Sequence, residues 1–271
     1  MRLRVDNLKA MPADKIRLGG MALPNGVLVH GPTAWACAIR LPDGQLKVAS
    51  ERKGFRAARV GNPLLRGPAK LLEVFALLPV LRRRLPEAKL PFERPHVLAA
   101  MAGSTVAVRL VRENDRIGLA AQELLSGLLS IAPAALALRG SDLAGYHGAE
   151  HVSIGTYEHG EPRAKEHERC GSHLVGPLVT TTALGNLLAA RAPAHLRGGA
   201  RAAASLGAIA ASTEIFAWMT RHPDNRLARV LARPGHELQS RLATAEPTAA
   251  QLEVAEAALS ACLALEEADG P

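Results

Sequence analysis

Four apolar stretches in the centre of the chain constrain its fold more than any other feature of the sequence. Each runs for about 15 to 22 residues, close to the length of a helix that crosses a bilayer. Small residues are frequent in them, and only 3% of the chain is aromatic. Such helices pack closely in lipid as well as in a buried bundle. We therefore expect four helices, membrane-spanning or buried, that begin near His96, Ile117, Leu174 and Ala200.

Two glutamates, Glu123 and Glu214, lie inside these apolar stretches. A carboxylate in an apolar environment is costly unless it is paired or used. Glu214 is either a further ligand or proton carrier, or the partner of an arginine at a helix end, such as Arg66. The ion pair is the favoured interpretation.

The region before these stretches is typical of short strands. From Leu18 to about Ser50, the runs AWACAIR and QLKVAS flank an Asp43-Gly44 turn, which is a strong hairpin signal. Several glycines and prolines are expected to break this region into short pieces. Helical spacing then begins at Pro63 and continues to Pro86. At the other end of the chain, Thr248 and Gln251 form a capping-box pattern before an amphipathic helix.

These patterns predict a mainly α fold, a helical and membrane-associated bundle with a small β-rich N-terminal module. The module covers residues 15–60, and the bundle covers 61–245. The bundle carries a metal-binding connection at 146–173, and residues 246–271 form the amphipathic C-terminal helix.

The charge and the cysteines indicate the partner and the compartment. A net charge of +8 favours an acidic partner. The scarcity of aromatic side chains argues against a stacking surface for bases, so we expect membrane lipid and no nucleic acid. Salt-sensitive binding to nucleic acid is the remaining alternative. The three separated cysteines indicate a reducing compartment, with Cys37 and Cys262 in the core. The first fifteen residues lack the apolar run of a secretory signal.

The segment from Tyr146 to His173 carries the chemistry, because it holds five of the ten histidines. His147 and His151 are four residues apart, so on a helix both imidazoles reach one ion. Glu150 lies beside them, where its carboxylate can act on a metal-bound water. The pattern H-x-x-E-H is the inverted form of a zinc-protease helix signature. A solvated histidine pair on a surface helix is the alternative.

Cys170 favours metal binding over that alternative, because a thiolate is a strong zinc ligand. His147, His151 and Cys170 would leave one position open for water, as in a catalytic site. His167 as a fourth ligand would instead close the site and make the metal structural. Each imidazole needs an acceptor for its second nitrogen, and Glu158 or Glu166 is a candidate for it, although a solvent-facing carboxylate is the favoured interpretation of each.

Four separated blocks of the sequence form a recognisable pattern together. They are LGGMALPNGVLVHGPTAWACAIRLPDGQL, PLLRGPAKLLE, YHGAEH with HERCGS, and TEIFAWMTRHPDNRLARVLARPGHELQSRLATAEPTAAQLEVAEAAL. These blocks resemble the YqhQ-like family, a domain of unknown function described as predicted metal-dependent enzymes. Compared with that family, Asn25, His30 and Glu168 replace residues that are usual there, and the spacer before His167 is shorter.

The resemblance implies a multi-pass protein of the bacterial inner membrane with an internal metal site, expected on the cytoplasmic side. From the residues and the resemblance together, we expect a metal-dependent hydrolase with Glu150 as general base. Zn²⁺ is the expected metal, and another divalent transition metal is possible. The alternative is a membrane scaffold or assembly factor with a structural metal. The sequence names neither the substrate nor the oligomeric state.

Overall fold

The computed structural model describes residues 15–268 and is mainly helical, with a four-stranded N-terminal sheet. This confirms the predicted fold class. The prediction about a secretory signal concerns residues 1–15, of which the structure describes Lys15 alone. The last three residues of the predicted C-terminal helix, 269–271, also lie outside the described residues. The strands pair antiparallel in chain order and are β1 (Gly19–Leu23), β2 (Gly26–His30), β3 (Ala34–Arg40) and β4 (Leu46–Arg52).

The hairpin turn at Asp43-Gly44 lies where the sequence predicts it, but the glycines of β1 have an additional role. Gly44 joins β3 to β4 with a φ of +86°, a conformation that favours glycine. Gly19 and Gly20 lie within β1 rather than at its ends. A Cβ atom on Gly20 would approach the carboxylate of Glu150 to 2.4 Å. Glycine in β1 therefore leaves room for a side chain of the candidate site.

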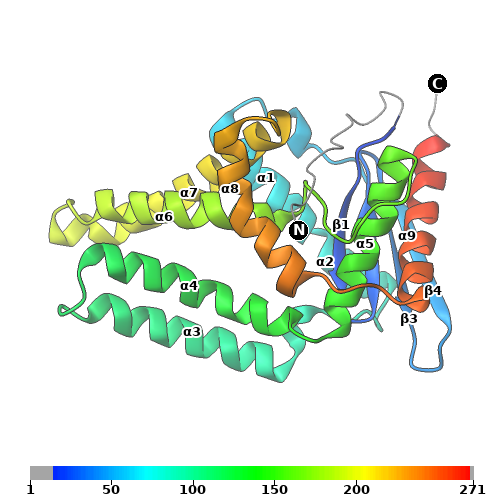
Figure 1. The fold of residues 1–271 in the computed structure, drawn as a ribbon, viewed down its shortest axis with the longest axis horizontal. Helices are drawn as coiled ribbons and strands as arrows, with labels where there is room; N and C mark the ends of the chain where they lie inside the picture. Colours follow the sequence, from blue (N-terminus) through cyan, green and yellow to red (C-terminus); the bar gives the residue numbers. More distant parts are fainter. Residues whose placement is uncertain (1–14, 269–271) are drawn as a thin grey trace, which may run out of the picture.

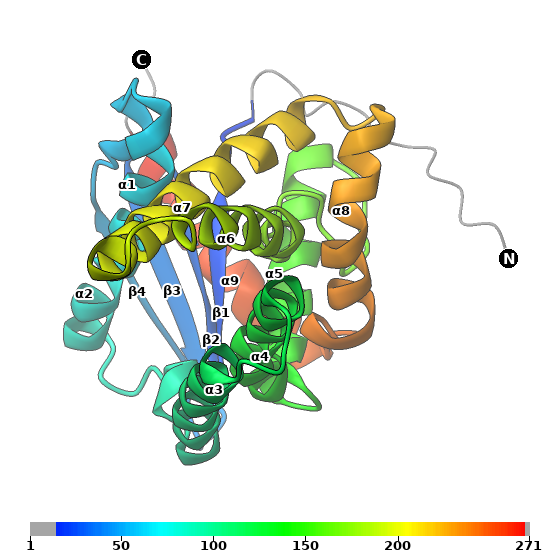
Figure 2. The same ribbon diagram turned by 90° about the vertical axis from the view of Figure 1, so that its left-hand side faces the viewer.

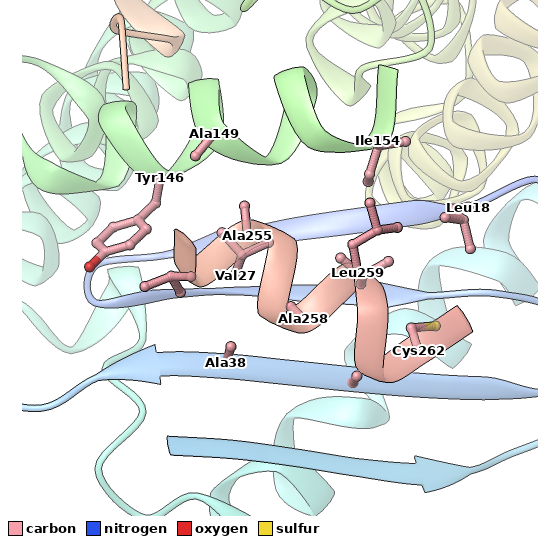
Figure 3. Packing of buried hydrophobic residues seen from close by; sticks show 13 residues of the cluster. Leu18, Val27, Ala38, Tyr146, Ala149, Ile154, Ala255, Ala258, Leu259 and Cys262 are labelled. Carbon is pink, nitrogen blue, oxygen red and sulfur yellow. The ribbon is translucent and has the colours of Figure 1, made fainter. Parts of the chain in front are cut away.

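Helices cover both faces of the sheet. Side chains alternate along a strand, so β2 sends Val27 and Val29 to one face and Leu28 to the other. The first face packs on α5 (Asp142–His159) and α9 (Ala249–Glu267), as Figures 1 and 3 show. The second face packs on α2 (Leu77–Arg84). The sheet is therefore the central layer, and α5 is fixed against it.

The N-terminal capping of α9 follows from the sequence, whereas the contacts near its C-terminal end are visible only in the structure. Thr248 and Gln251 form the predicted capping box. Near the other end, the buried Glu266 carboxylate accepts hydrogen bonds of 2.8 Å from the backbone amides of Thr33 and Ala34. These bonds hold the turn between β2 and β3. Cys37 and Cys262 are both buried, as expected for core residues.

The four predicted apolar helices form two hairpins that project from the layered part in the same direction (Figures 1 and 2). One hairpin is α3 (Pro95–Glu113) and α4 (Leu119–Leu138), and the other is α6 (Val175–Ala189) and α7 (Arg197–Arg221). Two helical segments, Leu119–Leu138 and Ala194–Arg221, are long and apolar enough to cross a membrane. The remaining helices are α1 (Pro63–Phe75) and α8 (Arg226–Leu238).

Both glutamates of the apolar stretches are paired. Arg66 of α1 forms an ion pair with Glu214 of α7, with Nε at 2.6 Å from Oε1. The ion-pair interpretation of Glu214 is therefore confirmed. The buried Glu123 carboxylate of α4 accepts hydrogen bonds from Asn186 at 2.7 Å and Arg112 at 3.1 Å. This group joins α3, α4 and α6.

The sheet and the terminal helix share one core, although the sequence places them in separate parts of the chain. Tyr146, Ala149 and Ile154 of α5 and Val254 and Ala258 of α9 belong to the same buried cluster. The division of the chain at residues 60 and 245 stays a prediction.

Candidate metal centre

The H-x-x-E-H motif lies on α5, as the spacing predicts, and α5 is held close to its neighbours by glycines. His147 and His151 are one turn apart, with ring centroids separated by 4.4 Å. Gly148 lies between them, and a Cβ atom there would be 2.1 Å from the carbonyl oxygen of Ala245. Ala245 in turn donates its amide to the carbonyl of Ala144, at 2.9 Å. The segment before α9 therefore lies directly against the candidate metal-binding motif.

Backbone carbonyls fix the two imidazoles. Nδ1 of His147 is 2.8 Å from the carbonyl oxygen of Ala243, and Nδ1 of His151 is 2.6 Å from that of Lys165. A carbonyl oxygen only accepts, so both Nδ1 atoms carry the hydrogen and both Nε2 atoms keep a lone pair. This is the tautomer that a metal ion requires. The prediction that Glu158 or Glu166 would be the acceptor is wrong.

Cys170 completes a three-ligand group. Its Sγ is 3.4 Å from Nε2 of His147, and the ligand atoms of His147, His151 and Cys170 all lie within 4.8 Å of one another. Tetrahedral zinc places neighbouring nitrogen and sulfur ligands about 3.5 Å apart, given Zn–S of about 2.3 Å and Zn–N of about 2.0 Å. The three residues could therefore hold a metal ion after a contraction of about an ångström at the widest pair.

The surroundings of this group favour the uncharged form of His151. Burial lowers the pKa of His151, and a hydrogen bond with Cys170 opposes that shift. Neutral imidazole is the form that binds a metal. The Cys170 thiol accepts a hydrogen bond of 3.5 Å from the amide of Ser172, at the start of a 3₁₀ turn, Gly171–Leu174. The thiol is thus presented by a turn.

His167 lies beside this group, and the structure gives its ring other partners. Nε2 of His167 is 3.3 Å from the buried Glu158 carboxylate, and Nδ1 accepts the amide of Arg169 at 3.2 Å. Its ring centroid is 5.5 Å from that of His151. Glu158 also forms an ion pair with Arg169. The role of His167 as a fourth ligand stays a prediction.

Gln239 holds the loop that carries His167, and the sequence analysis missed it. The side chain is fully buried. Its oxygen accepts the His167 amide at 2.9 Å, and its nitrogen lies 2.7 Å from the hydroxyl of Ser172 and 3.0 Å from Nε2 of His173. An isolated glutamine in a helical segment gives no signal of this role, because its partners are 66 or more residues away.

Glu150 is buried against β1, on the same helix as the two histidines. Desolvation raises the pKa of its carboxyl group, and the neighbouring His147 opposes this shift. Glycine at position 20 provides the space that the carboxylate occupies. A carboxyl group with a raised pKa in a cavity is suited to proton transfer near neutral pH.

Glu150 and the three-ligand group line the same cavity, which has a volume of about 470 Å³. Polar groups come from α5 and the loop at 167–172. Apolar side chains come from β1, α1 and α4. The cavity therefore combines candidate metal ligands, a buried carboxyl group and an apolar wall, which is the usual composition of a small-molecule site.

Comparison with known proteins finds a family model that matches the part of the chain that carries this group. Residues 141–265 match the family described as protein of unknown function (DUF1385). The DUF1385 match begins just before α5 and ends within α9, so it includes all three candidate ligands and Glu150. No curated protein and no solved structure matches the chain. The finer resemblance to the YqhQ-like family stays a prediction.

Proposed function

We propose that this chain is a metal-dependent hydrolase, with zinc bound by His147, His151 and Cys170. The observation that carries the proposal is the convergence of these three ligand atoms, with both Nδ1 atoms already bonded to carbonyls. Three protein ligands with an open fourth position are typical of catalytic rather than structural zinc. When bound, zinc lowers the pKa of a coordinated water to about 7.

Glu150 is the proposed general base. Its carboxylate lines the cavity next to the ligands and is shielded from bulk solvent. The buried carboxylate accepts a proton from the attacking water and returns it to the leaving group. Its position against β1 keeps it from rotating away, because the sheet packs directly on α5.

Metal analysis tests this assignment. Wild-type protein, loaded with zinc and then dialysed, is expected to carry about one zinc ion per chain, and Cys170→Ala less than a tenth of that, because the thiolate is the strongest of the three ligands. Inductively coupled plasma mass spectrometry measures the content. Cys262→Ala is the matched control, since that thiol is buried in the core away from the site and should keep the metal. Equal metal in wild type and Cys170→Ala would overturn the proposal.

We further propose that the two helical hairpins insert into the bacterial inner membrane, with the metal group on the cytoplasmic side. Large apolar side chains on these hairpins face outward, which is costly in water. The reduced Cys170 ligand is compatible with the cytoplasm. Exposed residues on the hairpins include Leu98, Val106, Leu110, Leu124, Leu128, Leu184, Leu188 and Leu206.

Membrane fractionation tests the insertion. The chain is expected to stay in the membrane pellet after an alkaline carbonate wash. Replacing Leu124 and Leu128 with lysine should move most of it to the supernatant, because each charge on a lipid-facing helix costs about 2.5–3.5 kcal/mol. Val48→Lys, on exposed β4, is the control and should stay in the pellet. Release of the wild type by the wash would contradict the insertion.

A further inference from the structure

We propose that the substrate is an amphiphile, in which a carboxylic ester or amide meets the metal group and an aliphatic chain lies along β1. This inference rests on the proposed hydrolase. The reaction adds water across the acyl bond: the C–O or C–N bond breaks, the carbonyl carbon gains the hydroxyl, and the leaving group takes the proton. Water is the only co-reactant.

The lining of the cavity combines the metal group and Glu150 with a larger set of apolar side chains. The edge strand β1 contributes to both parts: the Glu150 carboxylate lies against Gly20, and the next two residues, Met21 and Ala22, belong to the apolar lining. An extended apolar wall next to a hydrolytic centre is suited to bind a substrate with an aliphatic chain rather than a compact polar molecule. The apolar lining consists of Leu18, Met21, Ala22, Val74, Pro91, Ala134, Ala137, Leu138, Leu143 and Ile154.

Three residues that line the cavity are exposed: Gly20 and Gly171, next to Glu150 and Cys170, and Ala134 of α4. We take Ala134 as the position where the apolar chain of the substrate enters. Nearby on α1, Leu72 and Phe75 are 70% and 57% exposed. The α4 helix is one of the two segments long and apolar enough to cross a membrane. An amphiphile dissolved in the membrane could therefore enter the cavity with its aliphatic chain first, without passing through water.

The charges of the residues that line the cavity favour one chemistry for the head group of the substrate. Among the described residues that line it, Arg169 is the one lysine or arginine, and it is ion-paired with the buried Glu158. His30 packs its ring on Phe55, at 4.9 Å between centroids, and burial lowers its pKa. Apart from the metal itself, a phosphate would find no unpaired lysine or arginine among the described residues of this wall. A neutral acyl group needs none, which favours an ester or amide.

A series of alkyl hydroxamates tests the inference without the need for a known substrate. The full chain is purified in detergent and loaded with Co²⁺, and the visible absorption of the cobalt reports binding of acetohydroxamate, butanohydroxamate and hexanohydroxamate. The hydroxamate binds the metal, and the tail extends along the apolar wall. Affinity is expected to rise about fourfold for each added methylene, the value for burial of a CH₂ group.

Two variants distinguish binding of the hydroxamate's alkyl chain in the cavity from its partition into detergent. Ala134→Phe and Val74→Phe fill the apolar end from α4 and from α1. Each should abolish most of the chain-length dependence while the affinity for acetohydroxamate stays within about twofold. Ala121→Phe is the matched control, an exposed position of α4 outside the cavity, and should behave as wild type.

The outcomes distinguish the two proposals. If cobalt enters and acetohydroxamate binds, but longer chains bind no better than in Ala134→Phe and Val74→Phe, the amphiphile inference is wrong and the metal centre stands. If cobalt gives no thiolate absorption band in the wild type, the proposed hydrolase fails and this inference fails with it. A graded gain in affinity that both phenylalanine variants remove supports the inference.

Discussion

Glu150→Gln is expected to lower turnover by about a thousandfold while the zinc content stays at the wild-type level. The amide is nearly isosteric with the carboxylate, so it fits the space against Gly20, but it does not accept a proton from water. Loss of a positioned general base costs about 10² to 10⁴ in rate. The measurement is the initial rate on whichever ester, amide or phosphate ester the wild type hydrolyses in a chromogenic panel, together with metal analysis of the same samples.

The control for this prediction is Glu166→Gln, which removes a half-buried carboxylate on the loop that carries Cys170. It should keep at least half of the wild-type rate. An unchanged rate in Glu150→Gln with full metal content would remove Glu150 from the mechanism. The metal would then be assigned a structural role, and its removal should unfold the protein, because structural zinc contributes on the order of 10 kcal/mol to folding.

The local part of the site could be predicted from the sequence, because helical geometry alone brings His147 and His151 together. Cys170 could be added from its chemistry, since a thiolate near two imidazoles is a common ligand set. The acceptors of the two Nδ1 atoms could not be predicted. They are main-chain carbonyls of Lys165 and Ala243, and every residue has such a group. Their use depends on tertiary packing, which no side-chain pattern records.

The fold, like the site, has features that follow from the local sequence and features that depend on tertiary packing. The strands and the hairpin at Gly44 follow from local turn chemistry, and the apolar stretches become helices because of their length. The pairing of α5 and α9 on one face of the sheet joins segments about 100 residues apart, and the small residues in their contact, such as Ala149 and Ala258, give only a weak periodic signal. The glycines of β1 are expected to break a strand, yet in the structure Gly20 lies within β1 and makes room for Glu150. Close approach of this kind is a tertiary property.

Gly148→Ala is expected to lower the free energy of unfolding by about 3 kcal/mol and to weaken zinc binding as well. The added methyl group would meet the Ala245 carbonyl oxygen at 2.1 Å, and a backbone atom has no rotamer with which to yield. Overpacking against a rigid neighbour costs about 1 to 3 kcal/mol, occasionally more. Displacement of this segment would also move Ala243, whose carbonyl fixes the His147 tautomer.

Thermal or chemical unfolding in detergent measures the first effect, and competition with a chromophoric chelator measures the second. Gly103→Ala is the matched control, because nothing lies within 4 Å of its added methyl group and alanine favours a helix over glycine by about 1 kcal/mol. Stability should therefore rise slightly there, with zinc affinity unchanged. If Gly148→Ala matched the control in both measurements, the segment from Ala243 to Ala245 could not be what orients His147, and the preorganisation of the three-ligand group would need another source.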